Sequence, residues 1–68
     1  MDDVKRSVGE NIRKAREAKG LLQRELAKNA GVPVRTIGRI ERGEVDARLS
    51  TLARIADAMG LELEKLLK

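Results

Sequence analysis

Apolar residues recur along the chain with the spacing of amphipathic helices, and a glycine follows each of the first four periodic stretches. These glycines are Gly20, Gly31, Gly43 and Gly60. Glycine is the residue expected just past a helix C-terminus, because it adopts a left-handed backbone at little cost. The pattern predicts five helices, over about 4–19, 23–30, 33–42, 49–59 and 62–67. No stretch alternates with period two for long enough to predict a strand. We therefore expect an all-α fold, one compact five-helix domain spanning residues 1–68.

Each predicted helix has an apolar face that is expected to point inward. The predicted core consists of Val4, Val8, Ile12, Ala15, Leu26, Ala27, Ala30, Val32, Ile37, Ile40, Leu49, Leu52, Ile55, Ala56, Met59, Leu63, Leu66 and Leu67. Four leucines in the last helical region, Leu61, Leu63, Leu66 and Leu67, exceed what one short helix usually buries. Part of this leucine patch is a candidate dimer interface.

Composition narrows the function by exclusion. The 68 residues include no Cys and no His, which excludes disulfides, thiol nucleophiles, imidazole acid–base chemistry and zinc sites built from these residues. We expect no enzymatic activity, no cofactor and no metal site. The chain also has no Phe, Tyr or Trp, so it lacks the aromatic platforms on which single-stranded nucleic-acid binders stack bases.

Positive charge is concentrated in the first two thirds of the chain. The net charge is +4, and residues 1–43 hold eleven basic and six acidic residues, against four and five in residues 44–68. A basic region favours a polyanionic partner. Binding to a membrane surface is disfavoured because Glu10 and Glu17 interrupt the basic residues of the first helix. No signal peptide or membrane-spanning run is visible, so we expect a cytoplasmic protein with no membrane partner.

The stretch 23–42 has the features of two short helices joined by a tight turn. Helices that cross closely need small residues near the crossing, and Ala27 and Gly31 lie there, four residues apart. Once its apolar residues face the core, the second of these helices presents an outward stripe that is mostly basic. The stripe consists of Val34, Arg35, Gly38, Arg39 and Arg42.

These residues resemble the helix-turn-helix domain of the phage repressor/Cro type, which is widespread in bacterial regulators (Xre-like). The resemblance runs from Val8 to Leu67. It rests on Gly9, Lys19-Gly20-Leu21, Gln23-x-x-Leu26-Ala27-x-x-Ala30-Gly31-Val32, Thr36-Ile37-x-Arg39-Ile40-Glu41-Arg42-Gly43 and Leu52-x-x-Ile55-Ala56-x-Ala58-Met59-Gly60. It implies a five-helix fold whose third helix enters the DNA major groove.

The resemblance also implies roles for individual residues. Val34, Arg35 and Arg39 match base-reading positions. Gln23, Thr36 and Arg42 match positions that contact the DNA backbone. Arg16 and Glu41 match an ion pair that ties the first helix to the end of the third, which is a structural role.

Several positions depart from the family pattern. The family commonly has Thr or Ser at the position of Leu22, and Ser or Thr at that of Pro33. It commonly has Pro followed by Ser at the positions of Ala47 and Arg48. Three usual N-caps are thus lost or altered, each worth about 0.5–2 kcal/mol. Pro33 compensates in part if it lies in the first helical turn. Gly38 places a flexible residue inside the reading helix, at about 1 kcal/mol relative to Ala.

Two hypotheses of function follow. The first is a regulator, a repressor or autoregulator, that binds double-stranded DNA sequence-specifically as a homodimer. The second is a protein-interaction module, such as the antitoxin of a toxin–antitoxin pair, whose main ligand is a protein toxin. A third, more remote hypothesis is that the chain is an excised or engineered domain.

Overall fold

The computed structural model describes residues 2–68, with Asp2 described by its backbone alone, and this part of the chain is all-helical. The helices are α1 (Asp2–Ala18), α2 (Gln23–Ala30), α3 (Val34–Glu41), α4 (Leu49–Ala58) and α5 (Glu64–Leu67). The predicted all-α five-helix fold is confirmed, and the glycines predicted to end the first four helices all have positive φ. All the predicted ends are within two residues of those observed.

The end of α3 nearest the turn differs from the prediction for a physical reason. Pro33 has an extended backbone (φ −59°, ψ 142°) and precedes the helix as its N-cap residue, rather than lying in its first turn. Its carbonyl oxygen accepts hydrogen bonds from the N–H groups of Thr36 and Ile37. Pro33 therefore begins α3 through its carbonyl group and supplies no side-chain cap.

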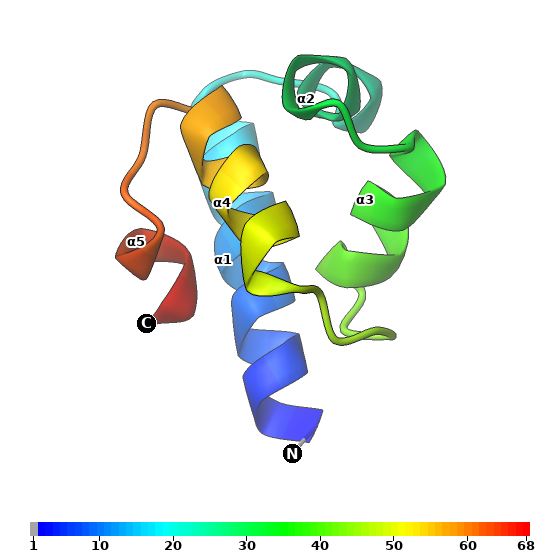
Figure 1. Cartoon of the computed structure of the whole chain (residues 1–68), viewed down its shortest axis with the longest axis vertical. Helices are drawn as coiled ribbons and strands as arrows, with labels where there is room; N and C mark the ends of the chain where they lie inside the picture. The colour runs from blue at the N-terminus through cyan, green and yellow to red at the C-terminus, as the bar shows by residue number, and fades with distance from the viewer. Residues whose placement is uncertain (1) are drawn as a thin grey trace.

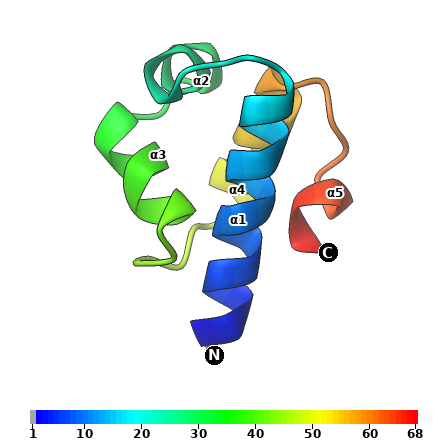
Figure 2. The same ribbon diagram turned by 180° about the vertical axis from the view of Figure 1, so that it is seen from behind.

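In the main contacts between elements, each helix packs against two others. Helix α3 contacts α1 and α2, α2 also contacts α4, and α5 contacts α1 and α4. Figures 1 and 2 show α3 and α5 on opposite sides of α1. The outer face of α3 is therefore left uncovered by the other four helices. Within residues 2–68, none of the helices has the length and apolar character needed to cross a bilayer.

The core is aliphatic and draws on all five helices. It consists of Val8, Ile12, Leu26, Ala27, Ala30, Val32, Ile37, Ile40, Leu52, Ile55, Ala56, Met59 and Leu66. Three residues predicted to be core are instead largely exposed: Val4 (60%), Leu49 (64%) and Leu67 (47%). Each lies in the first or last turn of its helix, where the helix extends past its neighbours, so periodicity alone overestimates burial there.

Helices α1 and α3 approach each other most closely at Gly9. A Cβ atom at this position would overlap the carbonyl oxygen of Ile40 and lie 2.8 Å from that of Glu41. Both obstacles are backbone atoms, which cannot rotate away as a side chain can. The hydrogen of Gly9 is thus what allows α1 to lie against the C-terminal end of α3.

Candidate nucleic-acid interface

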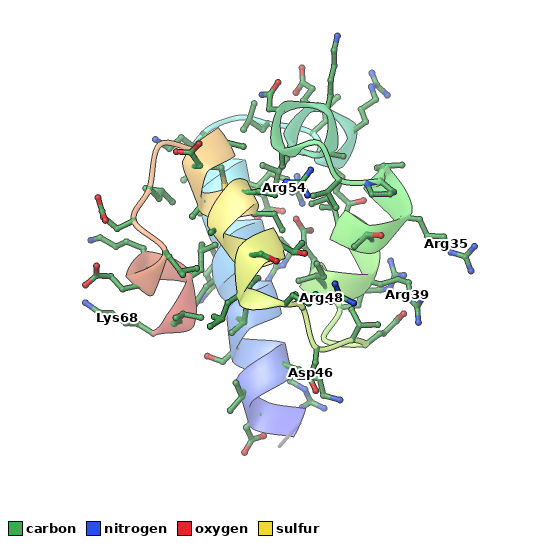
Figure 3. All side chains as sticks on the ribbon, viewed as in Figure 1. Arg35, Arg39, Asp46, Arg48, Arg54 and Lys68 are labelled. Atoms are coloured by element: carbon green, nitrogen blue, oxygen red, sulfur yellow. The ribbon has the colours of Figure 1, made fainter. Side chains whose placement is uncertain are left out.

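The turn between α2 and α3 is held by a backbone bond and by a side chain from α4. The N–H of Val32 donates to the carbonyl of Ala27 at 3.0 Å. Arg54 donates from Nη2 to the carbonyl of Gly31 at 2.6 Å, and Figure 3 shows it reaching from α4 toward this turn. A cation at a helix C-terminus also favours the helix dipole. The angle between α2 and α3 is therefore supported from outside the two helices.

A single carboxylate joins the first three helices. Arg16 on α1 donates to both oxygens of Glu41, from Nε at 2.7 Å and from Nη2 at 3.1 Å. Its remaining nitrogen, Nη1, donates to the carbonyl of Leu21 in the loop before α2. The side chains of Arg16 and Glu41 are only 11% and 2% exposed. The hydrogen bond to Glu41 raises the pKa of Arg16 above its already high usual value, so the Arg16 guanidinium stays charged.

Gln23 is the third partner of that carboxylate. Its Nε2 donates to Oε1 of Glu41 at 3.0 Å, whereas the family resemblance implies a contact with the DNA backbone. An amide nitrogen carries two hydrogens, so one remains to donate outward. The structure thus places Gln23 at the N-terminus of α2 as expected, but anchored to α3 by a contact that the motif did not indicate.

The outer face of α3 carries the predicted base-reading residues. Val34, Arg35 and Arg39 are exposed, whereas Ile37 and Ile40 on the opposite face are buried. Figure 3 shows Arg35 and Arg39 pointing away from the body of the molecule into open space. They are four residues apart, so their side chains lie one above the other on the same face. Thr36 is half-buried at the edge of this face.

Arg42 is exposed at the C-terminal end of α3, but it is paired. Its Nε lies 2.7 Å from Oε2 of Glu44 and its Nη2 lies 3.5 Å from Oε1. Arg39 is within 3.8 Å of the same carboxylate. Hydrogen bonding raises the pKa of Arg42 and lowers that of Glu44, which keeps both groups charged.

Gly38, predicted to lie on the outward stripe, is instead buried, because the side chains of Arg42 and Gln23 lie over it. A Cβ atom there would lie 3.1 Å from Nη1 of Arg42 and 3.7 Å from Oε1 of Gln23. The missing side chain therefore gives Arg42 and Gln23 room against α3.

Helix α2 begins without a full cap. The side chain of Glu25 accepts a hydrogen bond from the N–H of Leu22 at 2.8 Å, which is one half of a capping box. The other half requires an oxygen on the N-cap side chain, and leucine has none. Leu22 is half-exposed at this end of α2.

The four leucines of the predicted patch lie in different places in the structure. Leu66 is 1% exposed and belongs to the core, so the expectation that it contributes to a dimer surface is wrong. Its burial follows from the packing of α5 against α1 and α4. Leu61 and Leu63 are half-buried and line a shallow hollow beside Arg54 and Asp57.

Leu67 lies elsewhere, at the edge of an apolar groove of about 180 Å³. The groove is lined by Val4, Lys5, Val8, Ile40, Val45, Asp46, Ala47, Leu49, Leu52 and Leu67. Its exposed apolar members are Val4, Leu49 and Leu67. We call this surface the α1/α4/α5 groove.

Sequence reasoning missed Asn11, Arg54 and Glu44. Asn11 donates from Nδ2 to the carbonyl of Leu66 at 3.0 Å and so attaches α5 to α1. Asn11 and Arg54 bond to backbone atoms 55 and 23 positions away, which no local pattern indicates. Glu44 could have been found, since it lies two residues from Arg42.

Comparison with known proteins identifies the family. The helix-turn-helix family model HTH_3 matches residues 12–66. Control protein C.SmaI of Serratia marcescens is 38% identical over 65 residues, which cover 96% of this chain and 77% of that protein.

Two solved structures are similar over most of their length. The restriction-modification controller protein C.AhdI from Aeromonas hydrophila has a TM-score of 0.89 and 32% identity, covering 91% of this chain and 94% of that one. A hypothetical transcription factor, NHTF, from Neisseria has a TM-score of 0.92 and 28% identity, covering 100% and 79%. The chain therefore belongs to the HTH_3 family of helix-turn-helix transcriptional regulators.

Proposed function

We propose that this regulator binds double-stranded DNA sequence-specifically, with α3 in the major groove, and acts as a repressor or autoregulator. The observation that carries the proposal is the uncovered face of α3, from which Arg35 and Arg39 extend one turn apart. An arginine guanidinium matches O6 and N7 of guanine, and each such contact is worth about 1–3 kcal/mol of discrimination. Val34 offers an apolar contact suited to a thymine methyl group.

Residues around this face would position the protein on the DNA backbone. Arg42 at the end of α3 and the N-terminus of α2 at Gln23 would contact phosphates, because the first N–H groups of a helix lack partners within it and attract anions. Thr36, at the edge of the reading face, would do the same. The buried pair between Arg16 and Glu41 fixes α3 relative to α1, while Gln23 fixes α2.

Two copies of the chain would provide a complete binding unit. Dimeric helix-turn-helix proteins place their reading helices about 34 Å apart. This distance exceeds the longest dimension of one copy, which measures 28 × 22 × 21 Å. The α1/α4/α5 groove is the surface we assign to the partner copy. It combines exposed apolar side chains with Lys5 and Asp46 at its lining, and a patch that carries both charge signs can complement itself across a two-fold axis.

The hypothesis of an antitoxin has less support. The relatives described above are named as control proteins and a transcription factor, which favours regulation as the main activity. No feature of the described residues points to a toxin.

Binding measurements on three variants distinguish residues that read bases from residues that contact phosphates. The duplex is first selected from a random pool with the wild-type protein. Arg39→Ala should weaken binding to the selected duplex by about 1–3 kcal/mol more than binding to random duplex. Arg42→Ala should weaken both alike and reduce the salt slope by about one unit.

Lys68→Ala is the control, because it removes one positive charge on the side of the molecule away from Arg35 and Arg39. It should leave base preference unchanged and affect binding least. An equal loss by Arg39→Ala on selected and random duplex would contradict the assignment of Arg39 as a base-reading residue.

A further inference from the structure

Glu44 places a negative charge on the surface that is otherwise built to meet phosphates. Its carboxylate lies 2.7 Å from Nε of Arg42 and 3.8 Å from Nε of Arg39. We propose that Glu44 is a specificity-determining residue, which occupies both arginines in the free protein and thereby suppresses binding to DNA that lacks the correct bases. This inference rests on the proposed function, because it assumes that Arg39 reads a base and Arg42 a phosphate.

The position of Glu44 is fixed by the backbone that ends α3. The N–H of Glu44 donates to the carbonyl of Arg39, and the N–H of Gly43 to that of Ile40, both at 3.0 Å. Gly43 has a φ of 72°, which favours glycine, and a Cβ there would lie 3.1 Å from Cα of Arg6. The loop is therefore anchored on α1 and holds Glu44 beside the two arginines.

Fold stability does not account for this carboxylate. All three side chains are about half exposed, and ion pairs at such sites contribute little. A negative charge near a helix C-terminus is also unfavourable, because that end of the helix dipole is negative. What the carboxylate does change is the availability of Arg39 and Arg42 to another anion.

The two kinds of DNA are affected unequally. Binding to random duplex depends almost entirely on phosphates, so both arginines must leave Glu44 to contribute to it. On the correct sequence Arg39 gains hydrogen bonds to a base, which replace its long contact with Glu44. Arg42 leaves Glu44 for a phosphate on either duplex, so neutralising Glu44 would affect that contact alike on both. Arg39 would gain an additional phosphate contact on random DNA alone, because on the correct duplex it is held by a base.

The test compares Glu44→Gln with wild type on the selected duplex and on random duplex over a series of salt concentrations. Each phosphate contact steepens the slope of log K against log salt by about 0.9. We expect the slope to steepen by about 0.9 on random duplex and to change little on the selected one, so that the ratio of the two affinities falls. Thermal melting should remain near that of wild type.

Glu64→Gln is the matched control. Glu64 is exposed on α5, on the other side of α1 from α3, and its replacement changes the net charge by the same amount. It should alter both slopes equally and slightly.

Three results would overturn the proposal. The first is an equal gain on both duplexes in Glu44→Gln, and the second is a gain no larger than that of Glu64→Gln. The third is a loss of affinity for the selected duplex that is traced to one base pair, which would make Glu44 a base-reading residue instead. Failure of the proposed function looks different, because the wild-type protein would then show no sequence preference between duplexes.

Discussion

At the scale of the residue, Gly9 is the glycine with the least room for a side chain. The carbonyl groups of Ile40 and Glu41 occupy the space of a Cβ atom, and no rotamer change can relieve that overlap. We expect Gly9→Ala to lower the free energy of unfolding by about 1–3 kcal/mol, although alanine is the better helix former. Urea unfolding would measure the loss. Ser7→Ala, at an exposed position in the same helix, should have little effect, and an unchanged midpoint for Gly9→Ala would contradict the close approach.

The buried pair of Arg16 and Glu41 gives a second prediction at this scale. Removing one partner of a buried ion pair costs about 3–5 kcal/mol, because the other charge is left unpaired. Arg16→Met should therefore be strongly destabilising, and Arg16→Met/Glu41→Leu should be less destabilising than either single change. Arg13→Met is the control, since Arg13 pairs with Glu10 and Glu17 at exposed sites and should cost under about 1 kcal/mol. A melting temperature of Arg16→Met equal to that of wild type would rule out the stabilising role of the pair.

At the scale of the element, the sequence predicts what depends on neighbours along the chain. The glycines indicate the ends of the first four helices, because each adopts a positive φ after a periodic stretch. The outward stripe of α3 also follows from periodicity, except at Gly38, which neighbouring side chains bury. The exposure of Val4 and Leu49 does not, since it depends on where a helix extends past its neighbours. The partners of Gln23 and Arg54 were equally unpredictable, because they lie 18 and 23 residues away.

The uncapped start of α2 gives a prediction for a whole element. Leu22 lacks the side-chain oxygen that would accept from the N–H groups of the first turn, while Glu25 already supplies the reciprocal bond. We expect Leu22→Ser to complete the capping box and raise the free energy of unfolding by about 0.5–2 kcal/mol. Leu22→Ala removes the same half-exposed side chain without adding an acceptor, so it should not stabilise. Equal unfolding midpoints for the two variants would show that the cap does not form.

At the scale of the whole molecule, the proposed dimer requires a surface that two copies can share. Of the predicted leucine patch, only Leu67 joins other exposed apolar side chains, Val4 and Leu49, at the α1/α4/α5 groove. Mutual burial of these side chains would contribute about 25 cal/mol per Å² of apolar surface. The rest of the patch is in the core or lines the separate hollow beside Arg54.

A charge placed in this groove should therefore separate the copies. We expect Leu67→Glu to sediment as a monomer at concentrations where wild type is dimeric, and to bind the selected duplex more weakly, because each copy would then bind its half-site alone. The selected site should be palindromic, with half-sites about 34 Å apart. Lys68→Ala changes the net charge by the same amount at the neighbouring position, outside the residues that line the groove, and should remain dimeric. Wild-type protein that is monomeric on DNA with a non-repeated site would exclude this interface, because a two-fold pair of reading helices must contact two copies of its sequence.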